Sequence, residues 1–268
     1  MKISIGISPC PNDTYIFDAL INNKIDCNGY IFEIYYEDVE KLNRWSFKNK
    51  LDFTKLSYNA YIKNYKDYVL IDSGSALGYG CGPIVIKLPN KKINHESLIA
   101  IPGVYTTANM LFNLAFPKYK NKKEFCFDQI ENCILSGEVD AGVVIHESRF
   151  TFKQNGLSQV LDLGEFWYKK TNLPIPLGGI VAKRSLPTEV VRDVEKLIRK
   201  SIEYANQNTT IPNKYILSHA SETDLDVINS HINLYVNDFS ISLGDIGRKS
   251  VQKLFNEYNI LNNEIFFE

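Results

Sequence analysis

Short apolar runs alternate with segments of helical period through most of this 268-residue chain. Lys2–Ile7 (KISIGI) is typical of a buried strand, and the residues from Tyr15 to Leu20 follow a helical pattern. Leu51–Leu56 (LDFTKL) and Asp140–Ile145 (DAGVVI) are further predicted strands, each next to a helical segment. This alternation indicates an α/β protein, because strands and helices that follow one another in this way pack as layers around a common core.

Two seams interrupt the pattern, one near residues 88–96 and one near residues 171–179. The alternation restarts between them, which predicts a second α/β lobe rather than an inserted loop. We therefore expect a larger α/β lobe made of residues 1–88 and 178–268, and a smaller α/β lobe made of residues 89–177. Two lobes joined by a double crossover would enclose a central cleft, which is a common location for small-molecule sites.

Charge and hydropathy argue against several classes of protein. Lys and Arg number 30 and Asp and Glu number 31, so the chain has no basic excess for nucleic acid. No apolar run approaches the roughly 20 residues that cross a bilayer. The start of the sequence, MKISIGISPCPNDTYIF, lacks the pattern of an export signal. We expect a cytoplasmic protein with no nucleic-acid partner and no membrane insertion.

Cysteine and histidine spacing gives no sign of a metal centre. The five cysteines include no CxxC pair, and the four histidines include no HxH or HExxH pattern. Reduced thiols are the simplest interpretation of an odd, scattered set of cysteines. We expect no metal and no disulfide framework.

His146 is the strongest candidate for chemistry, because it directly follows the predicted strand DAGVVI. Ligands of open α/β sheets bind beyond the carboxyl ends of the strands, and imidazole accepts a proton near neutral pH. Glu147 comes next, but adjacent residues that leave a strand point in opposite directions. The alternative is a histidine that only bonds the backbone at the end of a strand.

Two predicted helix starts could bind an anion. TKLS ends a strand at Ser57, and GVYTTAN opens a helix near Thr106 and Thr107. Free N–H groups at helix starts bind carboxylates, so two such ends suggest a clamp for a small carboxylate. Each of these hydroxyl residues could instead only cap its own helix.

Two loops complete the candidate set. SPCPNDT places Cys10, Asn12 and Asp13 at the end of the first strand, where a rigid wall of the site is a simpler role than a nucleophilic thiol. The glycine run SGSALGYGCGP matches neither of the two nucleotide-binding patterns, GxGxxG and GxxxxGK(S/T). Ser73 and Ser75 of this run could still contact a ligand. The same run could equally serve as a hinge or allow tight packing.

Six motifs in order resemble the 1,4-dihydroxy-6-naphthoate synthase family of menaquinone biosynthesis. They are SPCPNDTYIFDAL, TKLSYNAY, SGSALGYGCGP, GVYTTAN, GVVIHE and LPIPLGGI, and they extend to about residue 185. The resemblance implies a fold like the type II periplasmic binding proteins. It also implies a cofactor-free lyase that forms 1,4-dihydroxy-6-naphthoate and dihydroxyacetone from cyclic dehypoxanthinylfutalosine.

Residue roles follow from the same resemblance. It implies that His146 is the proton acceptor and that the substrate contacts fall on Lys55, Leu56 and Ser57 and on Thr106, Thr107 and Ala108. Asn12, Asp13 and Ser75 join this set as candidates from the residues themselves. Two alternatives remain open: chorismate dehydratase of the same pathway, and a non-catalytic protein that binds a small carboxylate.

Overall fold

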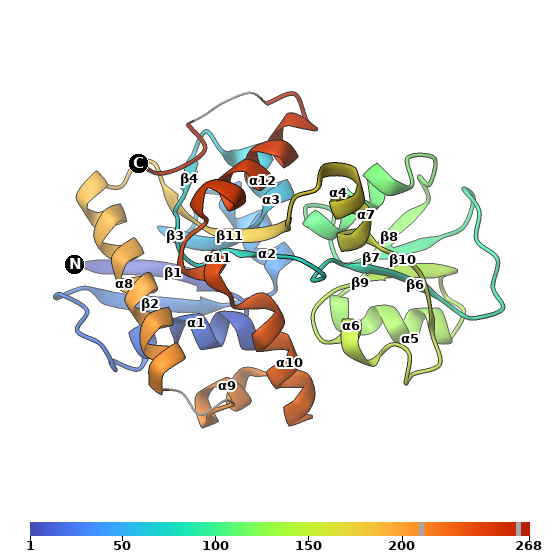
Figure 1. Cartoon of the computed structure of the whole chain (residues 1–268), viewed down its shortest axis with the longest axis horizontal. Helices are drawn as coiled ribbons and strands as arrows, with labels where there is room; N and C mark the ends of the chain where they lie inside the picture. Colours follow the sequence, from blue (N-terminus) through green and yellow to red (C-terminus); the bar gives the residue numbers. More distant parts are fainter. Residues whose placement is uncertain (209–211, 261–263) are drawn as a thin grey trace. The chain divides into compact units, whose positions relative to one another are not determined.

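The computed structural model describes residues 1–208, 212–260 and 264–268, and these form two compact units. Unit 1 comprises Met1–Gly78 and Pro176–Glu268, and unit 2 comprises Tyr79–Ile175 (Figure 1). The first seam therefore lies earlier than the sequence predicts, between Gly78 and Tyr79. The cause is strand β6 (Ile84–Lys87), which pairs with strand β9 (Ala141–Val144) of unit 2 and so cannot belong to the larger unit.

Unit 1 is built on a six-stranded sheet with the order β2-β1-β3-β11-β4, in which β5 also pairs with β11. Strand β1 pairs in parallel with β2 and β3, whereas β11 runs antiparallel to β3 and β4. The strands are β1 (Lys2–Ile7), β2 (Ile31–Tyr36), β3 (Phe53–Ser57), β4 (Tyr68–Leu70), β5 (Ala76–Gly78) and β11 (Ile175–Lys183).

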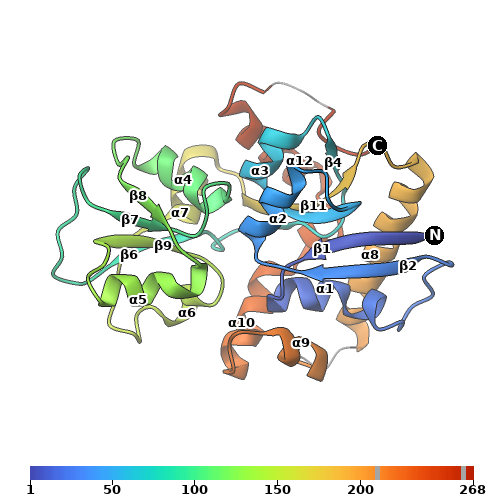
Figure 2. The ribbon, with the colours of Figure 1, turned by 180° about the vertical axis from the view of Figure 1, so that it is seen from behind.

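Helices cover both faces of this sheet. Figure 1 shows α8 (Thr188–Asn208) in front of the strands, where it packs on α1 (Pro11–Ile21). Figure 2 shows α2 (Val39–Ser46) and α3 (Tyr58–Asn64) on the opposite face. The remaining helices are α9 (Lys214–His219), α10 (Leu225–Tyr235), α11 (Asp238–Ile241) and α12 (Gly244–Asn256).

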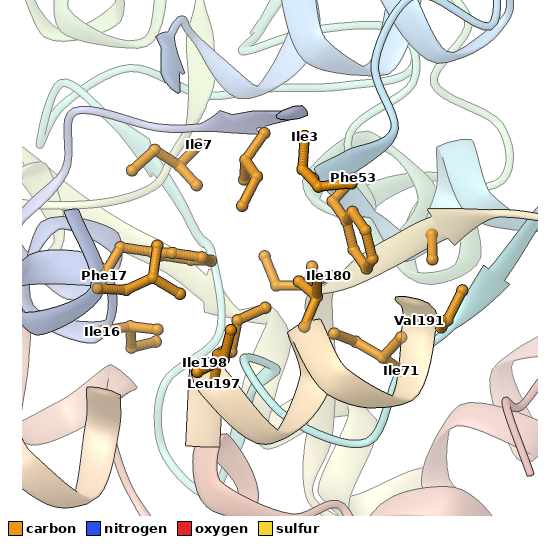
Figure 3. Close-up of a cluster of buried hydrophobic side chains, with 14 of the residues drawn as sticks. Ile3, Ile7, Ile16, Phe17, Phe53, Ile71, Ile180, Val191, Leu197 and Ile198 are labelled. Atoms are coloured by element: carbon orange, nitrogen blue, oxygen red, sulfur yellow. The ribbon is translucent and has the colours of Figure 1, made fainter. Parts of the chain in front are cut away.

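The main core of unit 1 lies between the sheet and helices α1 and α8. Figure 3 shows Ile3 and Ile7 of β1 facing Phe17 of α1 and the side chains of Leu197 and Ile198 on α8. All five side chains are fully buried. Burying each large apolar side chain contributes about 1.5–3 kcal/mol, so this layer fixes the strands from which the candidate loops emerge.

Unit 2 has a five-stranded sheet with the order β10-β6-β9-β7-β8. Its other strands are β7 (Ile99–Ile101), β8 (Lys122–Glu124) and β10 (Ser158–Asp162). Helices α4 (Thr107–Ala115) and α7 (Leu163–Thr171) contact each other, and α5 (Ile130–Leu135) packs on β9. The short helix α6 (Ser148–Thr151) and the 3-10 turn η1 (Phe127–Gln129) follow the carboxyl ends of β9 and β8.

The predicted strands and helices are confirmed in most places, with small shifts at their ends. Strand β9 ends at Val144 rather than at Ile145, and β11 begins at Ile175, within the second predicted seam. Residues 175–179, which the sequence pattern assigns to the second seam, are therefore already part of β11. Among the described residues, no helix is both long enough and apolar enough to cross a lipid bilayer.

Candidate active site

Three neighbouring parallel strands of unit 2 end at the same edge of its sheet. Strand β7 pairs in parallel with both β8 and β9. The chain beyond β9 carries His146, the chain beyond β7 leads to Thr106, and the chain beyond β8 leads to Phe127. The edge where ligands of α/β sheets bind therefore gathers two of the predicted site segments of this unit.

His146 has an unusual backbone conformation, with φ +55° in the left-handed region. Among the described residues other than glycine, the other positive φ angles all belong to asparagines: Asn23, Asn28, Asn49, Asn172 and Asn259. Left-handed backbone costs about 1–2 kcal/mol for most residues, and such conformations cluster at functional sites. The surrounding structure therefore holds His146 in a conformation that its side chain does not favour by itself.

The imidazole of His146 packs against the ring of Phe127. The two ring centroids lie 4.8 Å apart and the planes meet at 66°, which is an edge-to-face contact. Both side chains are half-buried. Phe127 carries no hydrogen-bonding side chain, so it orients the imidazole without competing for its proton. The sequence gives no signal for this pairing, because the two residues lie on different strand-end segments.

The second helix start that the sequence predicts is the N-terminus of α4. The hydroxyl of Thr106 accepts a hydrogen bond from Asn109 N at 3.2 Å and donates one to Gly103 O at 2.8 Å. Thr106 thus caps its own helix, as the simpler interpretation holds. Helix geometry still leaves the first-turn N–H of Ala108 without an acceptor inside the helix, so α4 keeps a donor suited to an anion.

In unit 1, the first turn of α1 and strand β3 are joined by an ion pair. The Lys55 ammonium lies 2.9 Å from Asp13 Oδ1, with 7% and 1% of the two side chains exposed. The same ammonium donates to Gly74 O at 3.2 Å, which adds the glycine run to the cluster. Three motifs that are far apart in the sequence are therefore joined by one buried lysine. Lys55, which is a predicted substrate contact, therefore already bonds Asp13 and Gly74 within the protein.

The carboxylate of Asp13 is saturated with donors. Its Oδ2 accepts from Ser8 N at 3.1 Å and from Ser8 Oγ at 2.8 Å, and its Oδ1 also accepts from Asn12 Nδ2 at 2.9 Å. Asn12 in turn bonds the ring of His231 on α10, with 3.0 Å between Asn12 Oδ1 and His231 Nε2. His231 is fully buried, and no sequence motif marked it as a site residue, because it lies in the helical C-terminal part of the chain.

Ser57 stands at the N-cap of α3, as predicted, but its side chain does not cap that helix. Its Oγ accepts a hydrogen bond from Asn43 Nδ2 at 3.1 Å, and its N–H donates to Asn43 Oδ1 at 3.0 Å. Asn43 of α2 therefore holds both the backbone and the side chain of Ser57 in place. This support was missed in the sequence, where Asn43 falls within an ordinary amphipathic helix.

Ser75 and Leu56 are less accessible than the other candidates. Ser75 is fully buried and shares a 3.1 Å hydrogen bond with the phenol of Tyr58. Leu56 is also fully buried, so only its backbone is available for binding. A Cβ at Gly179 would lie 3.0 Å from Ser75 Oγ and 2.5 Å from Leu70 Cδ1, so this glycine permits the close packing of β11 here. Within the glycine run itself, a Cβ at Gly74 would lie 2.5 Å from Ile180 Cγ1, so this glycine also serves tight packing, one of the two roles considered for the run.

The described residues contain no cluster of three or more His, Cys, Asp or Glu side chains placed to hold a metal ion. The candidate site residues instead provide other groups. Unit 2 has a histidine at a strand end and helix N–H donors, and unit 1 has hydroxyl groups and a buried lysine–aspartate pair. Within unit 2, the helix N–H donors can bind a carboxylate and the histidine can transfer a proton.

Solved structures with low sequence identity show the class of fold. The chain aligns with a Candida albicans protein that has the generic periplasmic binding protein fold, with a TM-score of 0.72, 12% identity and coverage of 98% of this chain and 92% of that one. A crystal structure of a protein from Archaeoglobus fulgidus matches more closely, with a TM-score of 0.89, 32% identity and coverage of 96% and 97%. The chain therefore has a periplasmic-binding-protein-like α/β fold.

Sequence comparison shows the family within that class. A family model described as "Menaquinone biosynthesis" matches residues 3–259. The 1,4-dihydroxy-6-naphthoate synthase of Thermus thermophilus is 41% identical over 95% of this chain and 93% of its own length. The enzyme of that name from Streptomyces coelicolor is 35% identical, with coverage of 94% and 91%. The chain belongs to this menaquinone biosynthesis family of enzymes.

Proposed function

We propose that this chain is a carbon–carbon lyase that converts cyclic dehypoxanthinylfutalosine into 1,4-dihydroxy-6-naphthoate and dihydroxyacetone. The observation that carries the proposal is the similarity to the two synthases, which extends over nearly the whole chain. Because the family belongs to a biosynthetic pathway, we expect the reaction to take place in the cytoplasm.

His146 is the proposed general base. Its support is the strand-end position at the carboxyl edge of the unit 2 sheet, the enforced left-handed backbone and the ring contact with Phe127. In the proposed reaction the imidazole removes a proton from the sugar-derived part of the substrate. The ring then opens, a carbon–carbon bond breaks and a three-carbon fragment leaves. Formation of the aromatic diol supplies much of the driving force.

The substrate carries a carboxylate on its aromatic ring, and we assign its recognition to the start of α4. Thr106, Thr107 and the N–H of Ala108 are the proposed donors. In unit 1, Ser57 and Asn12 are the proposed polar contacts, and Lys55 and Asp13 form the buried pair beside Asn12. Leu56 can contribute only backbone groups, and Ser75 shares its hydroxyl with Tyr58.

The test is turnover by the purified chain of cyclic dehypoxanthinylfutalosine, with separate detection of the naphthoate by absorbance and of dihydroxyacetone by mass spectrometry. Equal amounts of both products support the proposal. The same assay after dialysis against EDTA, without added cofactor, tests the proposed independence of metals and cofactors. Retention of full activity is the expected result.

Two other outcomes would replace the proposal. Consumption of chorismate without turnover of the futalosine derivative would identify a chorismate dehydratase. Calorimetric binding of the futalosine derivative without any product would identify a non-catalytic carboxylate-binding protein. His146→Asn serves as the matched control, because it should retain binding while losing turnover.

A further inference from the structure

The turn that carries His146 is tied to the rest of unit 2 by one arginine three residues further along. Arg149 lies in α6, which is only four residues long and has no side-chain cap hydrogen bond. The backbone N–H of Arg149 donates to His146 O at 3.3 Å, so the two residues share one tight turn. A single helical turn is not stable by itself, and its fixation must come from contacts of its side chains.

The guanidinium of Arg149 supplies such contacts. It donates to the backbone carbonyls of Gly80 and Gly82 and to Asp162 Oδ2, the last at 2.7 Å. Only 14% of the Arg149 side chain and 6% of the Asp162 side chain are exposed. A planar guanidinium that bonds three groups in different directions has little freedom to rotate.

The partners of Arg149 are themselves fixed. Asp162 caps α7, because its Oδ1 accepts from Gly164 N at 2.8 Å and from Glu165 N at 3.2 Å. Gly82 packs directly on Gly164, where an added Cβ would lie only 2.1 Å from Gly164 N. Arg149 therefore connects the His146 turn to a rigid junction of β10, α7 and the segment before β6.

We infer that Arg149 is a positioning residue for His146. It holds the turn in which the imidazole keeps its strained backbone and its contact with Phe127, and it does not itself contact the substrate. This inference rests on the proposed function of His146 as the base. The donors of Arg149 already face Gly80, Gly82 and Asp162, which argues against a direct role in binding an anionic substrate.

The experiment compares Arg149→Met, Arg149→Lys and Asp162→Asn with the wild-type enzyme. Arg149→Met should lower kcat about 10- to 100-fold while KM changes less than about threefold. The reason is that Arg149 affects the position of the base His146, whereas the substrate carboxylate binds at the start of α4. Lysine cannot make the same set of bonds, so Arg149→Lys should restore only part of kcat. Asp162→Asn keeps an oxygen that can cap α7 and should have a smaller effect than Arg149→Met.

Arg184→Met is the matched control. Arg184 also donates to backbone carbonyls, those of Tyr65 and Glu264, but it lies in unit 1. This variant should retain kcat within about twofold. Guanidinium ion at millimolar concentration should restore activity to Arg149→Ala but not to His146→Asn, a result that a purely structural loss would not produce.

A second readout separates failure of this inference from failure of the proposed function. The imidazole carbon–proton signal of His146, assigned with His146→Asn, should shift and broaden in Arg149→Met at the pH of the assay. If His146→Asn keeps its activity, the proposed base is wrong, and the signal alone then decides whether Arg149 positions the ring. An unchanged signal, or a kcat of Arg149→Met within twofold of wild type, would overturn the inference.

Discussion

Asp13 and Lys55 form an ion pair in the buried part of unit 1, with Asp13 Oδ1 2.9 Å from Lys55 Nζ. The pair is completed by hydrogen bonds from Ser8 and Asn12 to the carboxylate and from the ammonium to Gly74 O. A buried charge needs this complete set of partners, because desolvation costs several kcal/mol per ion. The pair therefore fixes the start of α1 against strand β3.

Removal of one partner should destabilise unit 1 strongly. Lys55→Met or Asp13→Asn leaves a buried charge without its counterion, and we expect each to lower the free energy of unfolding by about 3–5 kcal/mol. The double variant should lose less than the sum, since it leaves neither charge. Urea unfolding followed by circular dichroism measures all three. Strictly additive losses would show that the two groups do not interact.

The exposed pair Lys2–Glu33 offers a control for the variants of Lys55 and Asp13. Its ammonium and carboxylate are 2.8 Å apart, but 66% and 42% of the two side chains are exposed. Water and salt screen such a pair, so Lys2→Met should leave the urea midpoint within experimental error.

His146→Asn should abolish turnover and preserve the fold. Asparagine tolerates the left-handed backbone, and it occupies the other described positive-φ positions outside glycine. General base catalysis contributes about 10²–10⁴-fold, so kcat should fall by at least 100-fold. Product formation and the thermal midpoint measure the two effects. External imidazole should partly restore His146→Gly, and wild-type turnover by His146→Asn would exclude this histidine as the base.

Alkaline pH should destabilise the chain through its buried tyrosines. Burial raises the pKa of the Tyr58 phenol, which is fully buried beside Ser75. The unfolded chain loses this proton near pH 10 while the folded chain keeps it, so the free energy of unfolding falls as the pH rises above about 10. The loss is about 1.4 kcal/mol per pH unit for each such group.

Tyr58→Phe tests this dependence directly. The variant lacks the phenol proton, so its free energy of unfolding should fall less steeply between pH 10 and 11 than that of the wild type. Tyr79→Phe changes an exposed side chain and should keep the wild-type slope. Equal slopes for Tyr58→Phe and the wild type would show that the phenol of Tyr58 does not contribute to the loss of stability at alkaline pH.

Thiol reactivity should differ sharply between two cysteines of unit 2. Burial raises the pKa of the Cys81 thiol to about 12, so only about one molecule in 10⁴ carries the thiolate at pH 8. Cys126 is exposed. Ellman's reagent at pH 8 should therefore modify Cys126 in the native protein and reach Cys81 only after unfolding. The fast phase should disappear in Cys126→Ser, and its persistence would show that another thiol is accessible.

Elements with a strong pattern were predictable from the sequence, and elements with a weak pattern were not. Strand β1 and helix α1 appear where apolar periodicity places them. Strand β8 was missed because its residues, Lys122–Glu124, are all charged and its place in the sheet comes from pairing with β7. Strand β10 and helix α7 lie in a stretch whose polar residues conceal the period.

Candidate site residues followed from position, whereas their partners did not. A histidine after a buried strand and hydroxyl residues at helix starts can be recognised within a few residues of sequence. Phe127, Asn43 and His231 contact those residues from other elements, so only the fold brings them together. Arg149 is close to His146 in the sequence, but its partners Gly80, Gly82 and Asp162 are not. The early seam near Gly78 has the same origin, since the pairing of β6 decides it.

The place of β11 in the unit 1 sheet has a consequence for biosynthesis. It lies between β3 and β4, yet the ribosome makes it about one hundred residues after β4. Until then, β3 of the nascent chain has an open edge, and such edges invite aggregation. Unit 2 is continuous in sequence, and its synthesis is complete when β11 starts to emerge. The incomplete sheet of unit 1 must therefore be protected from aggregation during the synthesis of the whole of unit 2.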